Sequence, residues 1–230
     1  MDNNKNKIED LINAGVRIPC PYGVLIDPSA KIGEGTVIYP CTIIKEGCET
    51  GKNCVIGPGA VLYKTRAGDG CVLDSVHAEE AVIGSGVTAG PYVHIRPGSV
   101  IKDGVKLGNF VEIKNSEIGE KTAVSHLTYV GDSLVGKGVN FGCGTVTVNF
   151  NGKEKNRCEI GDNAFIGCNT NLIAPVKIGE RAYTAAGSTI TNDVPPDSLA
   201  IARSRQVVKA DWVKKKKPYR EKKNFNPQET

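Results

Sequence analysis

Large aromatic side chains are scarce in this chain of 230 residues, which has one Trp, five Phe, seven Tyr and a single Met. A core with so few large rings argues against an ordinary helical bundle. No apolar run approaches the roughly 18 residues that a membrane-spanning helix needs. The N-terminus, Met1-Asp2-Asn3-Asn4-Lys5, lacks the apolar segment of a signal peptide. These absences predict a soluble, cytoplasmic protein.

The cysteines do not form a recognisable motif. Eight are present, but no two make a CxxC pair, and a chain of this size without an export signal is expected to keep its thiols reduced. They are Cys20, Cys41, Cys48, Cys54, Cys71, Cys143, Cys158 and Cys168.

Excess positive charge is confined to the C-terminal end. The whole chain carries 29 Lys/Arg and 25 Asp/Glu, a net charge of +4, and the segment 211–230 alone holds seven basic and three acidic side chains. The segment 1–210 is therefore neutral overall, which gives no ground for predicting nucleic-acid binding. The basic tail, residues 208–230, is expected to be a solvated end, with contact to a phosphorylated cofactor or a neighbouring subunit as the alternative.

What the sequence does contain is a repeat of six residues. Aliphatic side chains recur at this interval in three long runs, with few exceptions. The runs are Ile26, Ile32, Ile38, Ile44, Thr50, Ile56 and Leu62; Ile83, Ala89, Ile95, Ile101, Leu107 and Ile113; and Ile160, Ile166, Leu172, Ile178, Thr184 and Ile190.

A period of six fits neither a helix nor one simple strand, but it fits a chain that turns a corner every six residues. Three flat faces then make a coil of about 18 residues, with one aliphatic side chain per face pointing inward, and coils stack about 4.8 Å apart. Between Ile26 and Ile201 this predicts nine or ten coils, an all-β prism about 45 Å long. A sandwich or an open α/β fold does not explain the unbroken register. Glycine follows many of the inward positions, as in Ile118-Gly119, and is expected there for backbone angles that other residues avoid.

Three segments interrupt the repeat. Residues 1–20 are expected to form a short helix that caps the first coil through Ile8, Leu11 and Ile12. The prism then occupies residues 21–207, with a corner loop at 64–70 and a longer polar loop at 148–158, of the kind that often carries function.

Polar residues that a prism does not need are candidates for chemistry. Arg96 and Lys114 each follow an inward aliphatic residue and are separated by one predicted coil length, so they are expected to stack on one face. Two like charges at strand spacing are costly unless an anion lies between them. The alternative is two solvated cations that point apart.

The segment Ser125-His-Leu-Thr-Tyr-Val-Gly-Asp132 is rich in donors and acceptors. His126 is a candidate general base, since imidazole is suited to proton transfer near neutral pH, although a lone histidine is often structural. A zinc site at His77, His94 and His126 is not expected. Their spacings along the chain are not whole numbers of coils, so the three cannot all reach one stacked position, and no carboxylate or cysteine recurs beside them.

Several motifs together are more specific than the repeat. They are His94-Ile-Arg-Pro-Gly98, Gly108-Asn-Phe-Val-Glu-Ile-Lys114, Ser125 to Asp132, Val139-Asn140, Gly142-Cys-Gly-Thr145 and Ala200-Ile-Ala-Arg203. With them, residues 15–212 resemble the C-terminal domain of the bifunctional N-acetylglucosamine-1-phosphate uridyltransferase / glucosamine-1-phosphate acetyltransferase family. The fold that this resemblance implies is a left-handed parallel β-helix of hexapeptide repeats. The family's nucleotidyltransferase domain is not found in this sequence, so no uridyltransferase activity is expected from it.

The resemblance also implies roles for individual residues. His126 matches the family's proton acceptor, and the sugar-phosphate contacts fall on Arg96, Lys114, Tyr129, Asn140 and Lys155, with Lys155 expected to reach a neighbouring subunit's cleft. The acetyl-CoA contacts fall on Cys143, Asn149, Phe150, Cys168, Ala186 and Arg203. No metal is expected, and the family implies a homotrimer with sites at subunit interfaces.

The activity implied is acetyl-CoA-dependent N-acetylation of glucosamine 1-phosphate, a step of UDP-N-acetylglucosamine biosynthesis. The alternatives are acetylation of another amino sugar and a non-catalytic trimeric scaffold. This chain departs from the family's commonest pattern at Cys143, Cys168 and the pair Phe150-Asn151, which stands where Tyr-Asp is usual. The last departure puts acetyl-CoA affinity in doubt.

Overall fold

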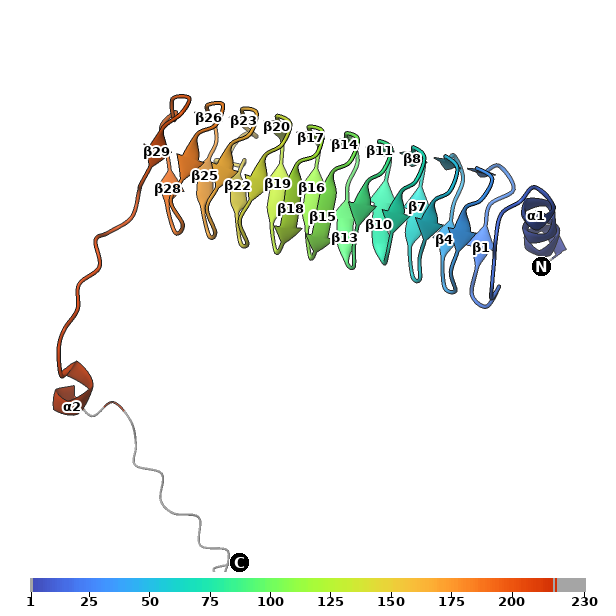
Figure 1. Ribbon diagram of the computed structural model, residues 1–230, viewed down its shortest axis with the longest axis horizontal. Coiled ribbons are helices and arrows are strands. Elements are labelled where there is room, and N and C mark those ends of the chain that lie inside the picture. The colour runs from blue at the N-terminus through green and yellow to red at the C-terminus, as the bar shows by residue number, and fades with distance from the viewer. Residues whose placement is uncertain (1, 217, 219–230) are drawn as a thin grey trace, which may run out of the picture.

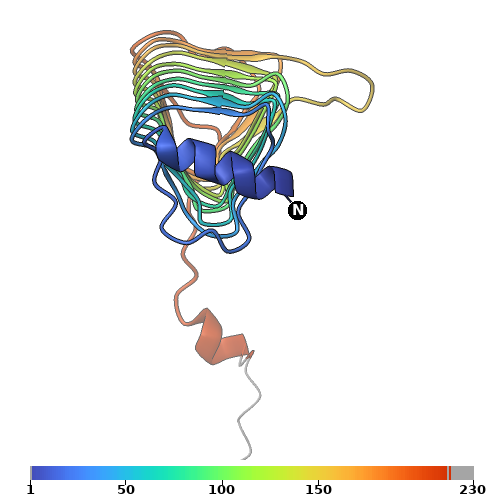
Figure 2. The same cartoon turned by 90° about the vertical axis from the view of Figure 1, so that its right-hand side faces the viewer.

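The chain is a left-handed parallel β-helix, a stack of about ten coils with an N-terminal helix at one end (Figure 1). The computed structural model describes residues 2–216 and 218. Viewed along the stack, the coils superimpose as a triangle (Figure 2). The prism and the coil number predicted from the six-residue repeat are therefore confirmed.

Each side of the triangle is one parallel sheet, and the three sheets contain 10, 9 and 10 strands. Face 1 consists of β1 (Leu25–Ile26), β4 (Ile43–Ile44), β7 (Val61–Tyr63), β10 (Val76–Glu79), β13 (Val93–Ile95), β16 (Glu112–Lys114), β19 (Tyr129–Gly131), β22 (Val146–Val148), β25 (Asn171–Ile173) and β28 (Thr189–Ile190).

Face 2 consists of β2 (Lys31–Ile32), β5 (Glu49–Thr50), β8 (Arg66–Ala67), β11 (Val82–Ile83), β14 (Val100–Ile101), β17 (Glu117–Ile118), β20 (Ser133–Val135), β23 (Cys158–Ile160) and β26 (Val176–Ile178). Face 3 consists of β3 (Val37–Ile38), β6 (Val55–Ile56), β9 (Val72–Leu73), β12 (Thr88–Ala89), β15 (Lys106–Asn109), β18 (Ala123–His126), β21 (Asn140–Phe141), β24 (Phe165–Ile166), β27 (Tyr183–Thr184) and β29 (Leu199–Ala200). In each face, neighbouring strands come from successive coils, so a fixed position on the face forms a column along the stack.

The core consists of the inward aliphatic side chains of all three faces, as the repeat predicted. Ile38, Ile95 and Ile166 are fully buried, and the other members of the three runs are buried as well, apart from the half-buried Ile32. Burying one such side chain contributes about 1.5–3 kcal/mol, and a long stack of them replaces a conventional core.

Most of the glycines after the inward positions are required for a different reason from the one expected, although Gly57 has the predicted positive φ, 89°. Gly119 does not have a positive φ; instead, a Cβ there would lie 2.4 Å from the carbonyl carbon of Gly136 in the next coil. Gly136 has the same relation to the backbone of Asp162. These corners need glycine because two backbones approach closely, not because of backbone angles.

Helix α1 (Asp2–Asn13) covers the open edge of the first coil. Asn4 accepts a hydrogen bond from the backbone N–H of Ile26 at 2.9 Å, which satisfies a donor that an uncovered edge strand would expose. Leu11 is buried and Ile8 packs against the core, but Ile12 is exposed, so only two of the three predicted capping residues serve. The helix is also shorter than the predicted residues 1–20.

Residues 64–70 are not a corner loop, as the sequence suggested, but part of a regular coil. They contain β8, which pairs with β5 and β11 on face 2. The coil here is shorter than the predicted length, since Val61 pairs with His77, and this shortening explains why the six-residue repeat breaks at this point of the sequence.

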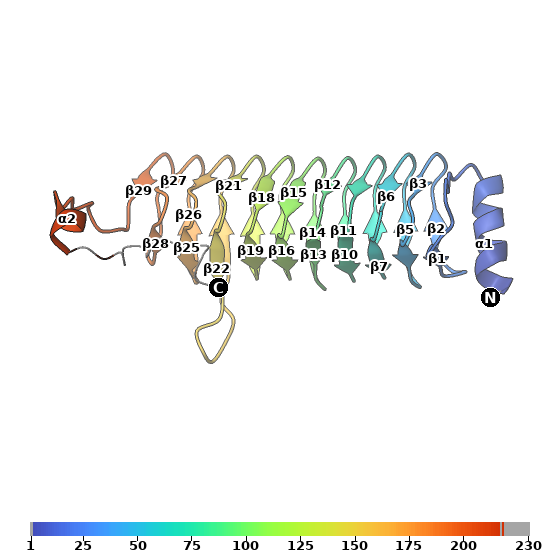
Figure 3. The same cartoon turned by 90° about the horizontal axis from the view of Figure 1, so that it is seen from below.

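The long loop between β22 and β23 leaves the prism as a hairpin (Figure 3). Phe150 and Lys155 form an antiparallel bridge in it, and Asn151 accepts the backbone N–H groups of Lys153 and Glu154 at 2.9 and 2.8 Å. The last strand ends at Ala200, and the chain then extends away from the prism to the short helix α2 (Trp212–Lys216). The rest of the predicted basic tail lies outside the described residues, except for residue 218.

Candidate active site

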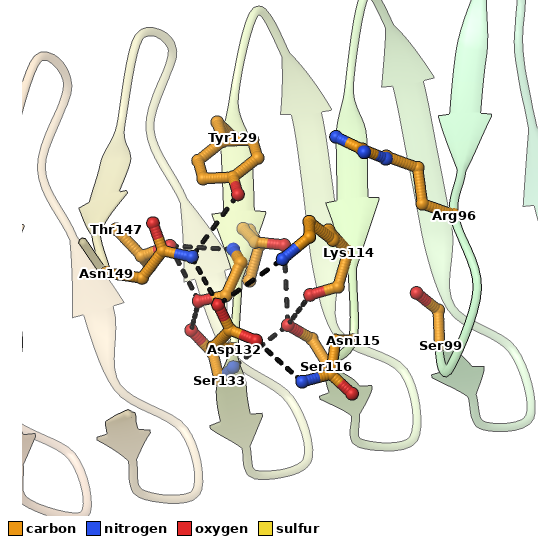
Figure 4. A network of polar contacts seen from close by, with 12 residues as sticks. Arg96, Ser99, Lys114, Asn115, Ser116, Tyr129, Asp132, Ser133, Thr147 and Asn149 are labelled. Atoms are coloured by element: carbon orange, nitrogen blue, oxygen red, sulfur yellow. Dashed lines mark hydrogen bonds and ion pairs between the residues drawn. The ribbon is translucent and has the colours of Figure 1, made fainter. Parts of the chain in front are cut away.

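Arg96 and Lys114 lie side by side on face 1, as the coil count predicted, because Ile95 pairs with Ile113 in the register of β13 and β16. What relieves their mutual repulsion is a carboxylate for each, which the sequence analysis did not foresee. Arg96 pairs with Glu112 at 2.8 Å between Nη1 and Oε1, and this ion pair raises the pKa of the guanidinium. Lys114 Nζ lies 3.6 Å from Asp132 Oδ2. In Figure 4 the Arg96 side chain stands apart from the polar cluster around Lys114.

Asp132 is the centre of that cluster. It lies at the corner after β19 with a positive φ of 48°, and only 9% of its side chain is exposed. Asn115 donates to its Oδ1 at 2.6 Å, and Asn149 donates to its Oδ2 (Figure 4). Burial alone would raise the pKa of Asp132, but these two amides and the ammonium groups of Lys114 and Lys155 outweigh it and lower the pKa. The carboxylate is therefore charged and holds Lys114 in place.

Tyr129 covers this cluster from the neighbouring position of β19. Its hydroxyl accepts a hydrogen bond from Asn149 Nδ2 at 3.4 Å. The space for the hydroxyl exists because residue 131 is a glycine: a Cβ there would lie 2.3 Å from the Tyr129 oxygen. Asn149, which the resemblance assigns to acetyl-CoA, is buried here and ties Tyr129 to Asp132.

Lys155, on the exposed hairpin, lies near Lys114 and Asp132. The neighbouring ammonium of Lys114 lowers the pKa of Lys155, and the Asp132 carboxylate opposes this effect. Within one chain Lys155 thus lies beside its own Lys114, and its expected reach into a neighbouring subunit's cleft stays a prediction. Face 1 and the hairpin together carry three cations, Arg96, Lys114 and Lys155, around Tyr129.

His126 ends β18 on face 3, on the other side of the corner that precedes Tyr129. It is exposed and lines a shallow hollow of about 490 Å³ together with Lys106, Asn109 and Ser125. Lys106 points outward from β15 and adds a cation to this hollow. It was not among the predicted site residues.

The predicted acetyl-CoA contacts continue from His126 along the same edge. Val124 pairs with Phe141, and this register places Cys143 one coil beyond His126. Cys168 and Ala186 occupy the next two coils, where the N–H of Asn169 donates to Cys143 O and that of Gly187 to Cys168 O, both at 2.7 Å.

We call this set of stacked residues, His126, Cys143, Cys168 and Ala186, the His126 column. Arg203 is exposed beyond the end of it, with its Cδ 3.8 Å from where a Cβ on Gly187 would lie. Phe150 is exposed on the hairpin instead.

One chain therefore divides the predicted residues into two groups. Arg96, Lys114, Tyr129, Asn149 and Lys155 belong to face 1 and the hairpin. His126, the exposed Asn140 and the rest of the His126 column belong to face 3 and its edge. The structure brings together the members of each group, but it does not bring the two groups onto one face.

The two remaining histidines correct another expectation. His77 and His94 are direct partners on β10 and β13, with ring centroids 5.1 Å apart, because this coil is slightly shorter than the predicted one. Glu79 lies beside them, with its Oε1 2.9 Å from His77 Nε2. Burial and the neighbouring His77 lower the pKa of His94. The prediction that no carboxylate lies beside the histidines is therefore wrong. The prediction that His126 lies apart from the other two histidines is confirmed.

Comparison with known proteins places this architecture. A family model described as bacterial transferase hexapeptide (six repeats) matches residues 29–64, 80–115 and 157–192. These three segments of the chain therefore consist of hexapeptide transferase repeats. The bifunctional protein GlmU of Acetivibrio thermocellus is 53% identical over 209 residues, which are 91% of this chain and 45% of that protein. The GlmU of Clostridium kluyveri is 47% identical over 216 residues, 94% of this chain and 47% of the relative.

The resemblance that the motifs carry is thus confirmed, and the chain spans about half the length of these curated relatives. A solved structure of LpxA, a UDP-N-acetylglucosamine acyltransferase from Bacteroides fragilis, is 21% identical with a TM-score of 0.44, over 76% of this chain and 68% of that one. Among the described residues of the hexapeptide-repeat chain, no helix is both long and apolar enough to cross a membrane.

Proposed function

We propose that this chain transfers the acetyl group of acetyl-CoA to the amine of glucosamine 1-phosphate, with His126 as general base. The observation that carries the proposal is the concentration of cations on face 1. Lys114 and Lys155 are close enough for one to lower the pKa of the other, and Asp132, buried beneath Lys114, is the carboxylate that opposes this effect. An anion that binds above Lys114 and Lys155 would relieve their repulsion, and a phosphate with several acceptor oxygens suits such a site.

Arg96 adds a planar, bidentate donor to this site. Arg96 lies beside Lys114, in the preceding coil of face 1, and its guanidinium is oriented by Glu112. The hydroxyl of Tyr129 and the amide of Asn149 supply polar groups beside the cations, as recognition of a sugar requires. The geometry supports a phosphorylated amino sugar better than a neutral one.

The chemistry follows from the reacting groups. The neutral amine nitrogen attacks the thioester carbonyl carbon, the C–S bond breaks, and the CoA sulfur leaves with the bonding electrons. His126 takes the proton from the attacking nitrogen and can return it to the leaving sulfur, a contribution of about 10²–10⁴ in rate. The N–H of Gly142 already donates to Ile166 O at 2.7 Å, so it is not the donor that would stabilise the oxyanion.

We also propose that the site is completed between copies of the chain, as a homotrimer. The cation site and His126 lie on different faces of one prism, which point away from each other. Face 1 of one copy opposite face 3 of a second copy would join them. Exposed apolar residues at the corner between the two faces support an interface there: Tyr92 and Phe110 stack with centroids 5.4 Å apart, and Leu127 follows in the next coil.

The substitution Arg96→Ala tests the acceptor. We expect the kcat/KM for glucosamine 1-phosphate to fall at least about tenfold, since charge-assisted hydrogen bonds to the phosphate are lost. The much lower activity expected with unphosphorylated glucosamine should not change. The measurement compares both acceptors with acetyl-CoA for each variant, and Lys102→Ala is the control, because Lys102 is a half-exposed cation on face 2 that pairs with Glu117.

Equal losses with both acceptors would contradict a phosphate site at Arg96. A higher kcat/KM for a different amino sugar would move the assignment to that acceptor. The absence of product with every acceptor, from folded protein, would favour a scaffold.

A further inference from the structure

Face 1 contains a second cluster of polar side chains, which adjoins the cation site because His94 lies two residues before Arg96 in the coil of β13. His77 and Glu79 project from β10, and His94 projects from the neighbouring position of β13. Their donor atoms all lie within 4.8 Å of one another. The acetyl-transfer chemistry proposed above uses none of the three.

These residues form the cluster because of the backbone, not by chance rotation of long side chains. His77 and Glu79 are two residues apart on one strand and so leave the same face, and the parallel register sets His94 directly beside His77. Both flanking inward residues, Val76 and Ala78, are buried, which fixes the strand that presents the donors.

Two imidazole nitrogens and one carboxylate oxygen are a ligand set for zinc and its first-row neighbours. Hard cations such as Mg²⁺ and Ca²⁺ prefer oxygen ligands only, so they are not favoured here. Ligands of one zinc ion lie about 3.4 Å apart when each is about 2.1 Å from the metal. The side chains of His77 and Glu79 are 48% and 38% exposed, so they are free to close the remaining distance by rotation.

The neighbours of the cluster leave a coordination position for solvent. Glu112, the partner of His94 on the next strand, is already held by Arg96 at 2.8 Å. On the other side, Val61 and Tyr63 of β7 pair with His77 and Glu79 and offer no strong metal ligand. Three protein ligands and one open position are the arrangement of an accessible zinc site.

We propose that His77, Glu79 and His94 bind one divalent transition-metal ion of the zinc type on face 1 of each chain. The ion bridges two successive coils, since its ligands come from β10 and β13. Binding therefore stabilises the folded chain at this point of the stack.

Zinc titration of the purified full chain, in competition with a chromophoric chelator, tests the proposal. Wild-type protein should bind one more zinc ion per chain than His77→Ala or His94→Ala, and Glu79→Gln should weaken this site at least about tenfold. The chain has three histidines in all, so His126→Ala is the matched control and should keep the site. Zinc held by cysteines would be the same in every variant, because none of them changes a cysteine.

A second readout comes from thermal unfolding. Zinc should raise the unfolding temperature of wild-type protein and of His126→Ala, and should not raise that of His94→Ala. Equal zinc stoichiometry and affinity in wild type, His77→Ala and His94→Ala would overturn the proposal and leave only the hydrogen bond between His77 and Glu79.

Discussion

Single buried charges determine how the candidate site is arranged. Lys114 is 18% exposed and would be free to turn away from Arg96 were it not for Asp132, whose carboxylate is fixed by two amides at a strained corner. The position of the cation therefore depends on an anion that the sequence motif contains but whose role only the contacts reveal.

The substitution Asp132→Asn should reduce the free energy of unfolding at pH 7 by about 1.5–3 kcal/mol, the usual worth of hydrogen bonds to a charged group. The pKa of Asp132 is lowered in the folded chain, so its charge stabilises the fold above about pH 4, the pKa of an unfolded Asp, and this contribution is lost as the pH falls through the folded-state pKa. Urea unfolding at pH 7 and pH 3 should show the difference between wild type and variant at pH 7 and its decline at pH 3.

The control for this comparison is Asp103→Asn. Asp103 is exposed on a corner and accepts the N–H of Ser85 at 2.7 Å, a bond that an amide oxygen can also accept. Its effect should stay within about 0.5 kcal/mol at both pH values. An Asp132→Asn variant as stable as wild type at pH 7 would mean that the carboxylate does not hold the cluster together.

Partners across a face could be predicted from sequence only where the coil length was known. Arg96 and Lys114 are separated by the predicted coil length and were placed correctly, whereas the shorter spacing of His77 and His94 was read as a mismatch. Coil length varies because corners differ in how many residues they take up, and a register counted from one coil does not carry over to the next.

At the scale of the element, the coils stack at close range because glycine columns at the corners let the backbones touch. Sequence reasoning found those glycines but attributed them to backbone angles. The positive φ values at other corners belong to glycines and asparagines such as Gly98 and Asn115, but also to Tyr92, Phe110 and Leu127, which a propensity argument would not place there. Tertiary stacking overrides the local preference in these coils.

This distinction predicts two different costs for glycine substitution. Gly119→Ala should lower the free energy of unfolding by about 1–3 kcal/mol or more, because its Cβ would overlap the backbone of Gly136 and must push two coils apart. Gly70→Ala should cost only about 1 kcal/mol, since Gly70 has a φ of +66° but no atom within 4 Å of the added carbon. Chemical denaturation of both variants checks the order, and a cost for Gly70→Ala equal to or above that for Gly119→Ala would contradict it.

The hairpin between β22 and β23 was predicted as a loop, but its internal order was not. Asn151, which departs from the family's usual Asp, accepts two backbone N–H groups at the turn. An amide oxygen and a carboxylate oxygen are both suited to this role, so the departure is compatible with the same turn.

For the whole molecule, the six-residue repeat predicted the architecture almost completely. A period shared by so many buried positions leaves few alternative folds, and the family resemblance added the hand. The candidate site was harder to predict from the sequence, because the predicted residues divide between face 1 and the His126 column. Motifs close in sequence, such as His126 and Tyr129, are separated by a corner and come to different faces.

The measurement that tests the central claim most directly is acetyl transfer from acetyl-CoA to glucosamine 1-phosphate by the purified full chain. Mass spectrometry is the suitable readout, because eight free cysteines would react with a thiol dye. We predict that wild-type protein forms N-acetylglucosamine 1-phosphate and that His126→Ala, with an unchanged unfolding temperature, forms it about 10²–10⁴-fold more slowly. Folded wild-type protein that forms no acetylated sugar phosphate, or a His126→Ala variant as fast as wild type, would contradict the account.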